Sequence, residues 1–169
     1  MTERTTPYGP TDPSPERGVA GPSTGDRLAR TMAGATGAVF LLVGLAGFIP
    51  GITTNVGDLE FAGHHSDAEL LGVFQVSVLH NLLHLLFGVA GIAMARRGML
   101  AVAYLLVGGV AYLGLWVYGL VVDHYGDANF VPLNSADNWL HLVLGVAMIA
   151  MGLIGQRAIR GGIGSQTAM

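Results

Sequence analysis

Cysteine and lysine are both missing from this chain of 169 residues, and charge of either sign is scarce. The absence of cysteine excludes disulfides, iron–sulfur ligation, thiolate metal sites and a cysteine nucleophile. Charged residues make up 11% of the chain, less than half of the roughly 25% that is usual in a soluble domain. Hydrophobic residues make up 51% of the chain, and a further 26 residues are glycine. A water-soluble fold of this length would therefore have too few polar residues to cover its surface.

Motifs of enzymes and of nucleic-acid-binding proteins are missing as well. The sequence has no nucleophile elbow, no phosphate loop, no HExxH and no acidic dyad inside an apolar segment, so no enzymatic activity is indicated. The arginines are scattered and form no basic patch, which argues against nucleic acid as a partner. The expected partners are the lipid bilayer and, through glycine-rich helix faces, a second copy of the chain or another membrane protein.

Proline, in contrast, is concentrated at the amino terminus, where residues 1–26 hold five of the seven. Glycine, serine and threonine separate these prolines, and such a segment cannot bury enough apolar area to offset its ordering entropy. We therefore predict a disordered cytoplasmic tail over residues 1–27. The first apolar run follows without a cleavage site, so it is expected to remain as the first span.

Four apolar segments follow the tail and predict an all-α, four-helix transmembrane bundle over residues 28–156. Each segment is long enough to cross about 30 Å of hydrocarbon as a helix. The second is expected to begin at a capping box formed by residues 66–69. Residues 157–169 are predicted to be a cytoplasmic tail. The expected helices cover residues 28–49, 67–95, 98–122 and 137–155.

The arginines predict the orientation of this bundle. All eight lie in the two tails, beside the first span or in the turn at residues 96–97, and the other two connections carry only acidic charge. By the positive-inside rule, both termini are cytoplasmic and the protein is a multi-pass protein of the cytoplasmic membrane.

An internal repeat joins the second and fourth segments. Residues 81–94 and 138–151 share ten identities in fourteen positions at an offset of 57. A weaker echo pairs residues 41–44 of the first segment with residues 105–108 of the third. The pattern predicts a duplicated helical hairpin with a pseudo-twofold axis along the membrane normal.

Three stretches, residues 47–51, 78–91 and 136–145, resemble the signature segments of the bacterial "domain of unknown function 4383" membrane family. They read Gly-Phe-Ile-Pro-Gly, Val-Leu-His-Asn-Leu-Leu-His-Leu-Leu-Phe-Gly-Val-Ala-Gly and Ala-Asp-Asn-Trp-Leu-His-Leu-Val-Leu-Gly. The resemblance covers about residues 28–156 and implies a four-helix integral membrane protein, common in actinobacteria. It supplies no reaction, no substrate and no site residue.

The repeated segments carry the polar residues that could form a site. On a helix Asn81, His84 and Gly88 share one face, and Asn138, His141 and Gly145 repeat that face. Polar side chains facing lipid are costly, so both faces are expected to turn inward, with the second and fourth helices side by side and the two glycines in contact. His80 lies one turn from His84, and the alignment pairs it with Asp137.

Three functions fit these residues. A structural role, with Asn81, His84, Asn138 and His141 hydrogen-bonded across the helices, is the one that we favour, and it needs no cofactor. A transition metal bound by His80, His84, Asp137 and His141 is the second. Axial ligation of haem b by His84 and His141 is the third.

These functions translate into classes of protein. The structural role corresponds to a structural or accessory component of a bacterial cytoplasmic membrane. Either cofactor would make the protein a small membrane redox protein. A small transporter or channel is less favoured, because the first and third segments supply almost no polar side chain to line a path.

Overall fold

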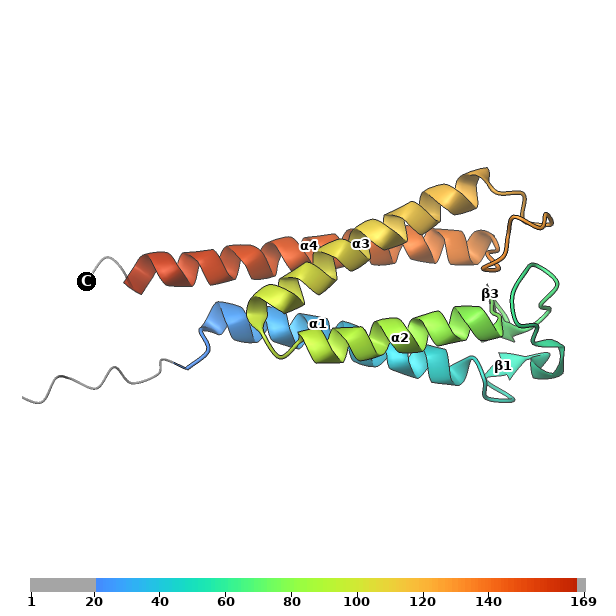
Figure 1. Ribbon diagram of the computed structural model, residues 1–169, viewed down its shortest axis with the longest axis horizontal. Coiled ribbons are helices and arrows are strands. Elements are labelled where there is room, and N and C mark those ends of the chain that lie inside the picture. The colour runs from blue at the N-terminus through green and yellow to red at the C-terminus, as the bar shows by residue number, and fades with distance from the viewer. Residues whose placement is uncertain (1–20, 167–169) are drawn as a thin grey trace, which may run out of the picture.

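The structure, a computed structural model, describes residues 21–166 with side chains up to Gly162, and it contains four α-helices (Figure 1). This confirms the predicted all-α, four-helix fold. Of the disordered tail predicted for residues 1–27, residues 1–20 lie outside the described residues, and the prediction is wrong for residues 24–27, which begin the first helix. The helices are α1 (Thr24–Ala46), α2 (Val78–Met94), α3 (Gly98–Val121) and α4 (Ser135–Gln166).

Three of the helices are long and apolar enough to cross a membrane: α1, α3 and the Ser135–Gly162 part of α4. Helix α2 is equally apolar but has 17 residues, or about 25 Å at 1.5 Å per residue. The sequence predicted four segments of spanning length, and the second is shorter than predicted.

Helix α2 is short because the residues before it form a small sheet and not the predicted first turns from residue 67. Ser66 is buried and its hydroxyl donates to the Val76 carbonyl, so it caps no helix. The cap is Ser77, whose Oγ accepts from the backbone N–H of His80 at 3.1 Å. The antiparallel strands are β1 (Thr53–Thr54), β2 (Glu69–Leu70) and β3 (Phe74–Gln75), and a 3₁₀ turn, η1 (Val56–Asp58), follows β1.

A tight turn between β2 and β3 explains why the capping-box interpretation was wrong. Leu71 and Gly72 there adopt φ of 56° and 67°, which a helix cannot accommodate. The four-residue pattern at 66–69 is a local signal, and the pairing of β2 with strands on both sides outweighs it.

The outer helices also differ from their predicted bounds. Helix α1 begins about one turn earlier, because Ser23 Oγ accepts from the Asp26 backbone N–H at 3.1 Å and caps it. It ends at Ala46, before the proline that was expected to stop it. Helix α4 continues to Gln166 through most of the predicted tail, because residues 157–166 contain no proline and their first turn packs on Gly25 of α1.

The helices associate as two hairpins, α1 with α2 and α3 with α4 (Figure 1). Helix α1 also packs against α3 and α4, and a buried core that includes Ala33, Leu105 and Met148 fills the space between them. Helices α2 and α4 do not pack closely, so the prediction that Gly88 and Gly145 are in contact was wrong. A Cβ on Gly88 would lie 2.8 Å from the Gly37 carbonyl oxygen of α1, and one on Gly145 would lie 3.0 Å from that of Gly109 in α3.

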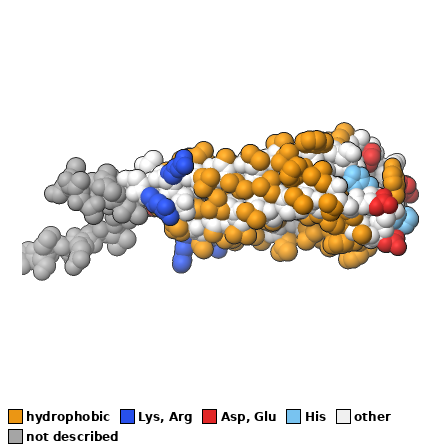
Figure 2. All heavy atoms as spheres, turned by 90° about the horizontal axis from the view of Figure 1, so that it is seen from above, with side chains coloured by type: hydrophobic (Ala, Val, Ile, Leu, Met, Phe, Trp, Pro, Cys, Tyr) orange, Lys and Arg blue, Asp and Glu red, His pale blue; other side chains and the backbone are white. Residues whose placement is uncertain are grey.

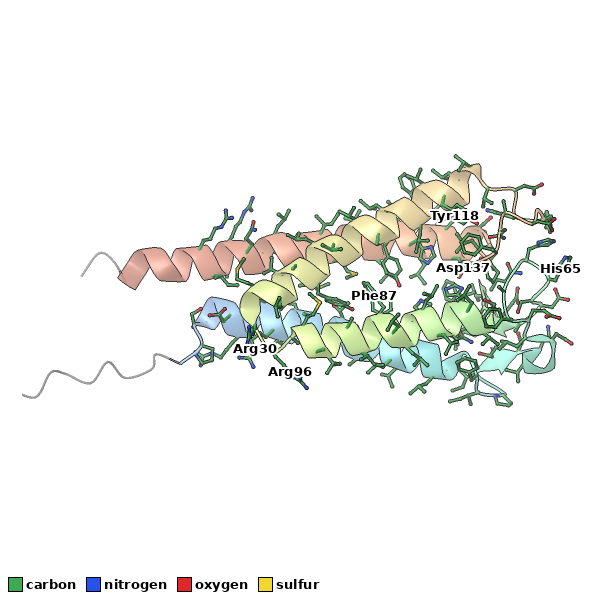
Figure 3. All side chains as sticks on the ribbon, in the orientation of Figure 1. Arg30, His65, Phe87, Arg96, Tyr118 and Asp137 are labelled. Atoms are coloured by element: carbon green, nitrogen blue, oxygen red, sulfur yellow. The ribbon has the colours of Figure 1, made fainter. Side chains whose placement is uncertain are left out.

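Charge separates the two ends of the bundle. Arginine side chains gather at one end, acidic and histidine side chains at the other, and apolar side chains cover the face between them (Figure 2). Arg30 and Arg96 lie at the first end and His65 lies at the second, and Asp137, at the start of α4, lies next to the second end (Figure 3). We call the first the arginine end and the second, formed by residues 47–77 and 122–134, the loop end.

Candidate functional site

Three histidines from the two hairpins meet near the loop end. His80 and His84 lie in the first two turns of α2, and His141 lies in the second turn of α4. The ring centroids of His80 and His84 are 4.6 Å apart, and those of His80 and His141 are 6.4 Å apart. The sequence singled out all three, and the structure brings them together into what we call the histidine cluster.

Two aromatic side chains that the sequence analysis missed complete the cluster. Phe40 of α1 stacks on His84 at 5.7 Å between ring centroids, and Tyr112 of α3 meets His141 edge-on at 5.2 Å. Phe40 and Tyr112 stack on each other at 5.3 Å. The sequence does contain a signal for both aromatic residues. Phe40 lies three residues after Gly37, Tyr112 lies three residues after Gly109, and a leucine follows each aromatic residue.

The histidine cluster carries unsatisfied polar atoms. Within the described residues, the Nδ1 atoms of His80, His84 and His141 have no hydrogen-bond partner, although all three atoms are buried. His80 is 5% exposed and His141 is 4% exposed. Because an unpaired polar atom in an apolar interior costs about 1–3 kcal/mol, three of them side by side need a physical reason. A ligand that exchanges hydrogen bonds with the imidazoles would supply one.

Two cavities adjoin the cluster, and all three histidines line both. One of about 260 Å³ lies between α2 and α3, and one of about 170 Å³ lies on the side of α1 and α4. The remaining walls of the larger cavity are mostly apolar and aromatic: Leu83, Leu86, Phe87, Ala90, Ala111, Tyr112, Leu115 and Val131.

Asp137 lies beside the smaller cavity, and backbone hydrogen bonds occupy one oxygen of its carboxylate. Asp137 Oδ2 accepts from the backbone N–H groups of Asn134 at 3.1 Å and of Gln75 at 3.0 Å. The Asp137 N–H donates in return to Asn134 Oδ1 at 3.0 Å, which makes a reciprocal capping box at the start of α4. Asp137 thus caps α4 and ties it to β3 of the other hairpin.

The two asparagines of the repeat pack against glycines and not against each other. Asn81 fills the space beside Gly47, and Asn138 fills the space beside Gly119, where a Cβ would collide with the amide in both cases. Within the described chain, both amide atoms of Asn81 and the Oδ1 of Asn138 have no hydrogen-bond partner. The expected hydrogen bonds between helices α2 and α4 are therefore not formed by these side chains.

The hairpins are instead joined by hydrogen bonds at the loop end. Besides the bond from Gln75 to Asp137, Asn134 Nδ2 donates to the Val73 carbonyl at 2.8 Å, and the Gly63 N–H donates to the Phe130 carbonyl at 2.7 Å. These bonds hold the two hairpins together at the loop end, next to the histidine cluster.

The helices and the cluster define an α-helical membrane protein in which histidines of two hairpins face apolar cavities. The chain belongs to the family described as "Domain of unknown function (DUF4383)", whose model matches residues 30–154 and so includes the whole histidine cluster. Comparison with curated proteins and with solved structures gave no match.

Proposed function

We propose that this chain is an accessory protein of a bacterial cytoplasmic membrane that binds a small, flat, oxygen-bearing aromatic head group at the histidine cluster. The observation that carries the proposal is that His80, His84 and His141, which line both cavities, each have a buried Nδ1 atom without a hydrogen-bond partner among the described residues. Imidazole nitrogens donate to a carbonyl oxygen or accept from a phenolic hydroxyl, so a quinone or phenol head would satisfy them.

The cavity walls support an aromatic ligand. Phe87 and Tyr112 line the larger cavity, and Phe40 lines the smaller. Aromatic rings favour stacked or edge-on neighbours. Both volumes lie below the roughly 300–1,000 Å³ of sites for drug-sized molecules, so only a small molecule, or the head of a longer one, fits. A tail could continue into the lipid past Ala111, which is exposed.

Quenching of tryptophan fluorescence by a short-chain benzoquinone, with purified full-length protein in detergent, tests this function. Wild-type protein should show saturable quenching, and His141→Gln should weaken the affinity at least tenfold. Ala111→Phe should abolish saturable quenching, because the added ring occupies the cavity mouth. Val107→Phe, which adds a ring on an exposed part of α3 outside the cavity, serves as the matched control.

The proposal fails if quenching is linear in wild-type protein, since that describes dissolution in the micelle. It also fails if Ala111→Phe and Val107→Phe behave alike. Size-exclusion chromatography of each variant separates loss of binding from loss of fold.

A bound metal or haem at the same histidines is the second candidate, supported by the same unpaired nitrogens. Its ligands would be His80, His84, Asp137 and His141 for a metal, or His84 and His141 for haem. Two features favour the head group: backbone N–H groups already bind Oδ2 of Asp137, and the neighbouring cavities are small. A Soret band, or one copper, zinc or iron per chain that disappears in His84→Gln, would favour the cofactor.

We further propose that both termini are cytoplasmic. The support is the gathering of arginines at one end of the bundle (Figure 2), which is the end at which α1 starts and α4 ends (Figure 1). Because the chain has no cysteine, single cysteines at Gly57 and Gly161 can be labelled selectively, and neither position has an atom within 4 Å of an added Cβ. An impermeant reagent should label Gly57→Cys in intact cells and leave Gly161→Cys unlabelled; the opposite pattern reverses the orientation.

A further inference from the structure

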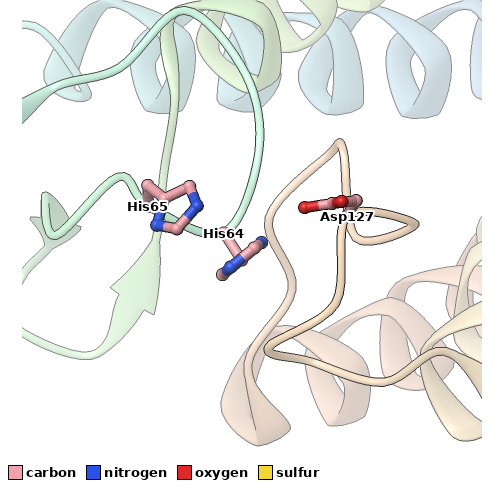
Figure 4. A group of neighbouring side chains, drawn as sticks. All are labelled: His64, His65 and Asp127. Atoms are coloured by element: carbon pink, nitrogen blue, oxygen red, sulfur yellow. The ribbon is translucent and has the colours of Figure 1, made fainter.

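A second group of chemistry-bearing side chains lies at the loop end, apart from the histidine cluster. His64 and His65 come from the connection between α1 and α2, and Asp127 comes from the connection between α3 and α4 (Figure 4). One ligand atom from each of the three, an imidazole nitrogen or a carboxylate oxygen, lies within 4.8 Å of the others. The two imidazole centroids are 3.9 Å apart.

The backbone on both sides of this group is held in place. The Gly63 N–H donates to the Phe130 carbonyl at 2.7 Å and so joins the two connections directly. Gln75 Nε2 donates to the His64 carbonyl at 3.1 Å, and the buried Asn129 donates through Nδ2 to the His124 carbonyl at 2.9 Å. The approach of the side chains therefore depends on hydrogen bonds that do not involve them, and the group is preorganised.

The donor set selects a class of ion. Two imidazoles and one carboxylate suit Zn²⁺, Co²⁺, Ni²⁺ or Cu²⁺, whereas Mg²⁺ and Ca²⁺ prefer oxygen ligands alone. Three protein ligands leave a fourth position for water, and the exposed side chains of His65 and Asp127 allow the ion to enter from solvent. The two connections that supply the group carry acidic residues and no arginine, and this negative charge raises the local concentration of cations.

We propose that His64, His65 and Asp127 bind one divalent transition-metal ion that bridges the two hairpins at the loop end. This site is independent of the proposed head-group site. Bound ion would hold the two connections together and add to the hydrogen bond between Gly63 and Phe130. Its binding would therefore stabilise the association of the hairpins.

Titration calorimetry with ZnCl₂ alone, on chelator-treated full-length protein in lipid nanodiscs, tests the site. We expect one Zn²⁺ per chain and at least tenfold weaker binding in each of His64→Gln, His65→Gln and Asp127→Asn. The matched controls are His124→Gln and Asp67→Asn, which remove a histidine and a carboxylate of the same loops outside the group. Both controls should bind within about twofold of wild type.

Two further measurements make the result decisive. His84→Gln should retain Zn²⁺ binding; if it loses the ion while the loop variants keep it, the ion belongs to the histidine cluster and the proposal is overturned. Zn²⁺ should raise the thermal unfolding temperature of wild-type protein but not of Asp127→Asn. Absence of stoichiometric binding to wild-type protein, or equal losses in the control variants, would also overturn it.

Discussion

The hairpin of α1 and α2 and the hairpin of α3 and α4 are held together by equivalent contacts. In the first, Gly37 and Gly88 face each other's backbone; in the second, Gly109 and Gly145 do the same. A leucine side chain of the neighbouring helix lies beside the second glycine of each pair: Leu41 beside Gly88, and Leu113 beside Gly145. Small residues allow this close approach of helices.

The recurrence extends to the polar and aromatic residues. Asn81 against Gly47 corresponds to Asn138 against Gly119, and the stacking of Phe40 on His84 corresponds to the contact of Tyr112 with His141. The equivalent residues of α1 and α3 are 72 apart, and not 64 as the echo of residues 41–44 in residues 105–108 indicated. The duplicated hairpin stays a prediction, and this recurrence of contacts supports it.

The hairpins differ at their loop ends. The first has three short strands before α2, and the second has an irregular connection before α4. At the aligned position, α2 carries His80, which joins the histidine cluster, and α4 carries Asp137, which caps its helix and binds the other hairpin. The comparison teaches that packing is the same in both hairpins where their helices touch, and that His84 and His141 belong to this shared pattern. His80, Asp137 and the loop-end side chains lie where the hairpins differ.

The glycine pairs give the strongest test of this equivalence. Gly88→Leu and Gly145→Leu should each destabilise the protein by about 3 kcal/mol, because a Cβ at either position would approach backbone oxygen at 3.0 Å or less. Gly114→Leu on α3, which has nothing within 4 Å of an added Cβ, should change stability by less than about 0.5 kcal/mol. Thermal unfolding in detergent measures all three, and a large difference between the first two would break the equivalence.

The helix caps are expected to differ in a measurable way. Asp137→Ala should cost about 2 kcal/mol, because it removes the cap of α4 together with the bond to the Gln75 N–H. Ser77→Ala should cost about 1 kcal/mol, because it removes only the cap of α2. Equal losses in denaturant unfolding would show that the bond between hairpins contributes nothing.

Replacement of the histidines should have a smaller effect on stability than on binding. His84→Gln and His141→Gln should each cost less than about 1 kcal/mol, because no described residue bonds to either Nδ1. A loss of 2 kcal/mol or more in thermal unfolding of ligand-free protein would indicate that these imidazoles stabilise the bundle directly.

The smallest effect is expected from the amino-terminal tail, which precedes only the first hairpin. Deletion of residues 2–20 should leave membrane yield and unfolding temperature unchanged, because its composition cannot build a core. The deletion keeps Ser23, the cap of α1, and a further deletion through residue 23 should lower stability by about 1 kcal/mol. A large loss from the shorter deletion would show that the tail contributes to the fold.

Prediction from the sequence succeeded where a single helix carries the signal. The bounds of α3 agree with the prediction to within one residue, because an uncharged run begins after Arg97 and ends at a polar connection. His80 and His84 were predicted to share a face from their spacing alone, and their rings do stack. The predicted start of α2 was wrong, because the pairing of β2 with β1 and β3 places the preceding residues in a sheet and not in a helix.

The sequence by itself determined that lipid is the solvent, that four apolar helices form and that positive charge lies at one end, because composition and helical periodicity are local properties. Only the tertiary structure decided which glycine faces which helix, that α2 and α4 stay apart, and that cavities open beside the histidines. It also brought Asp127 to His64 and His65. These features depend on how surfaces distant in the sequence fit together, and no periodicity within one segment records that fit.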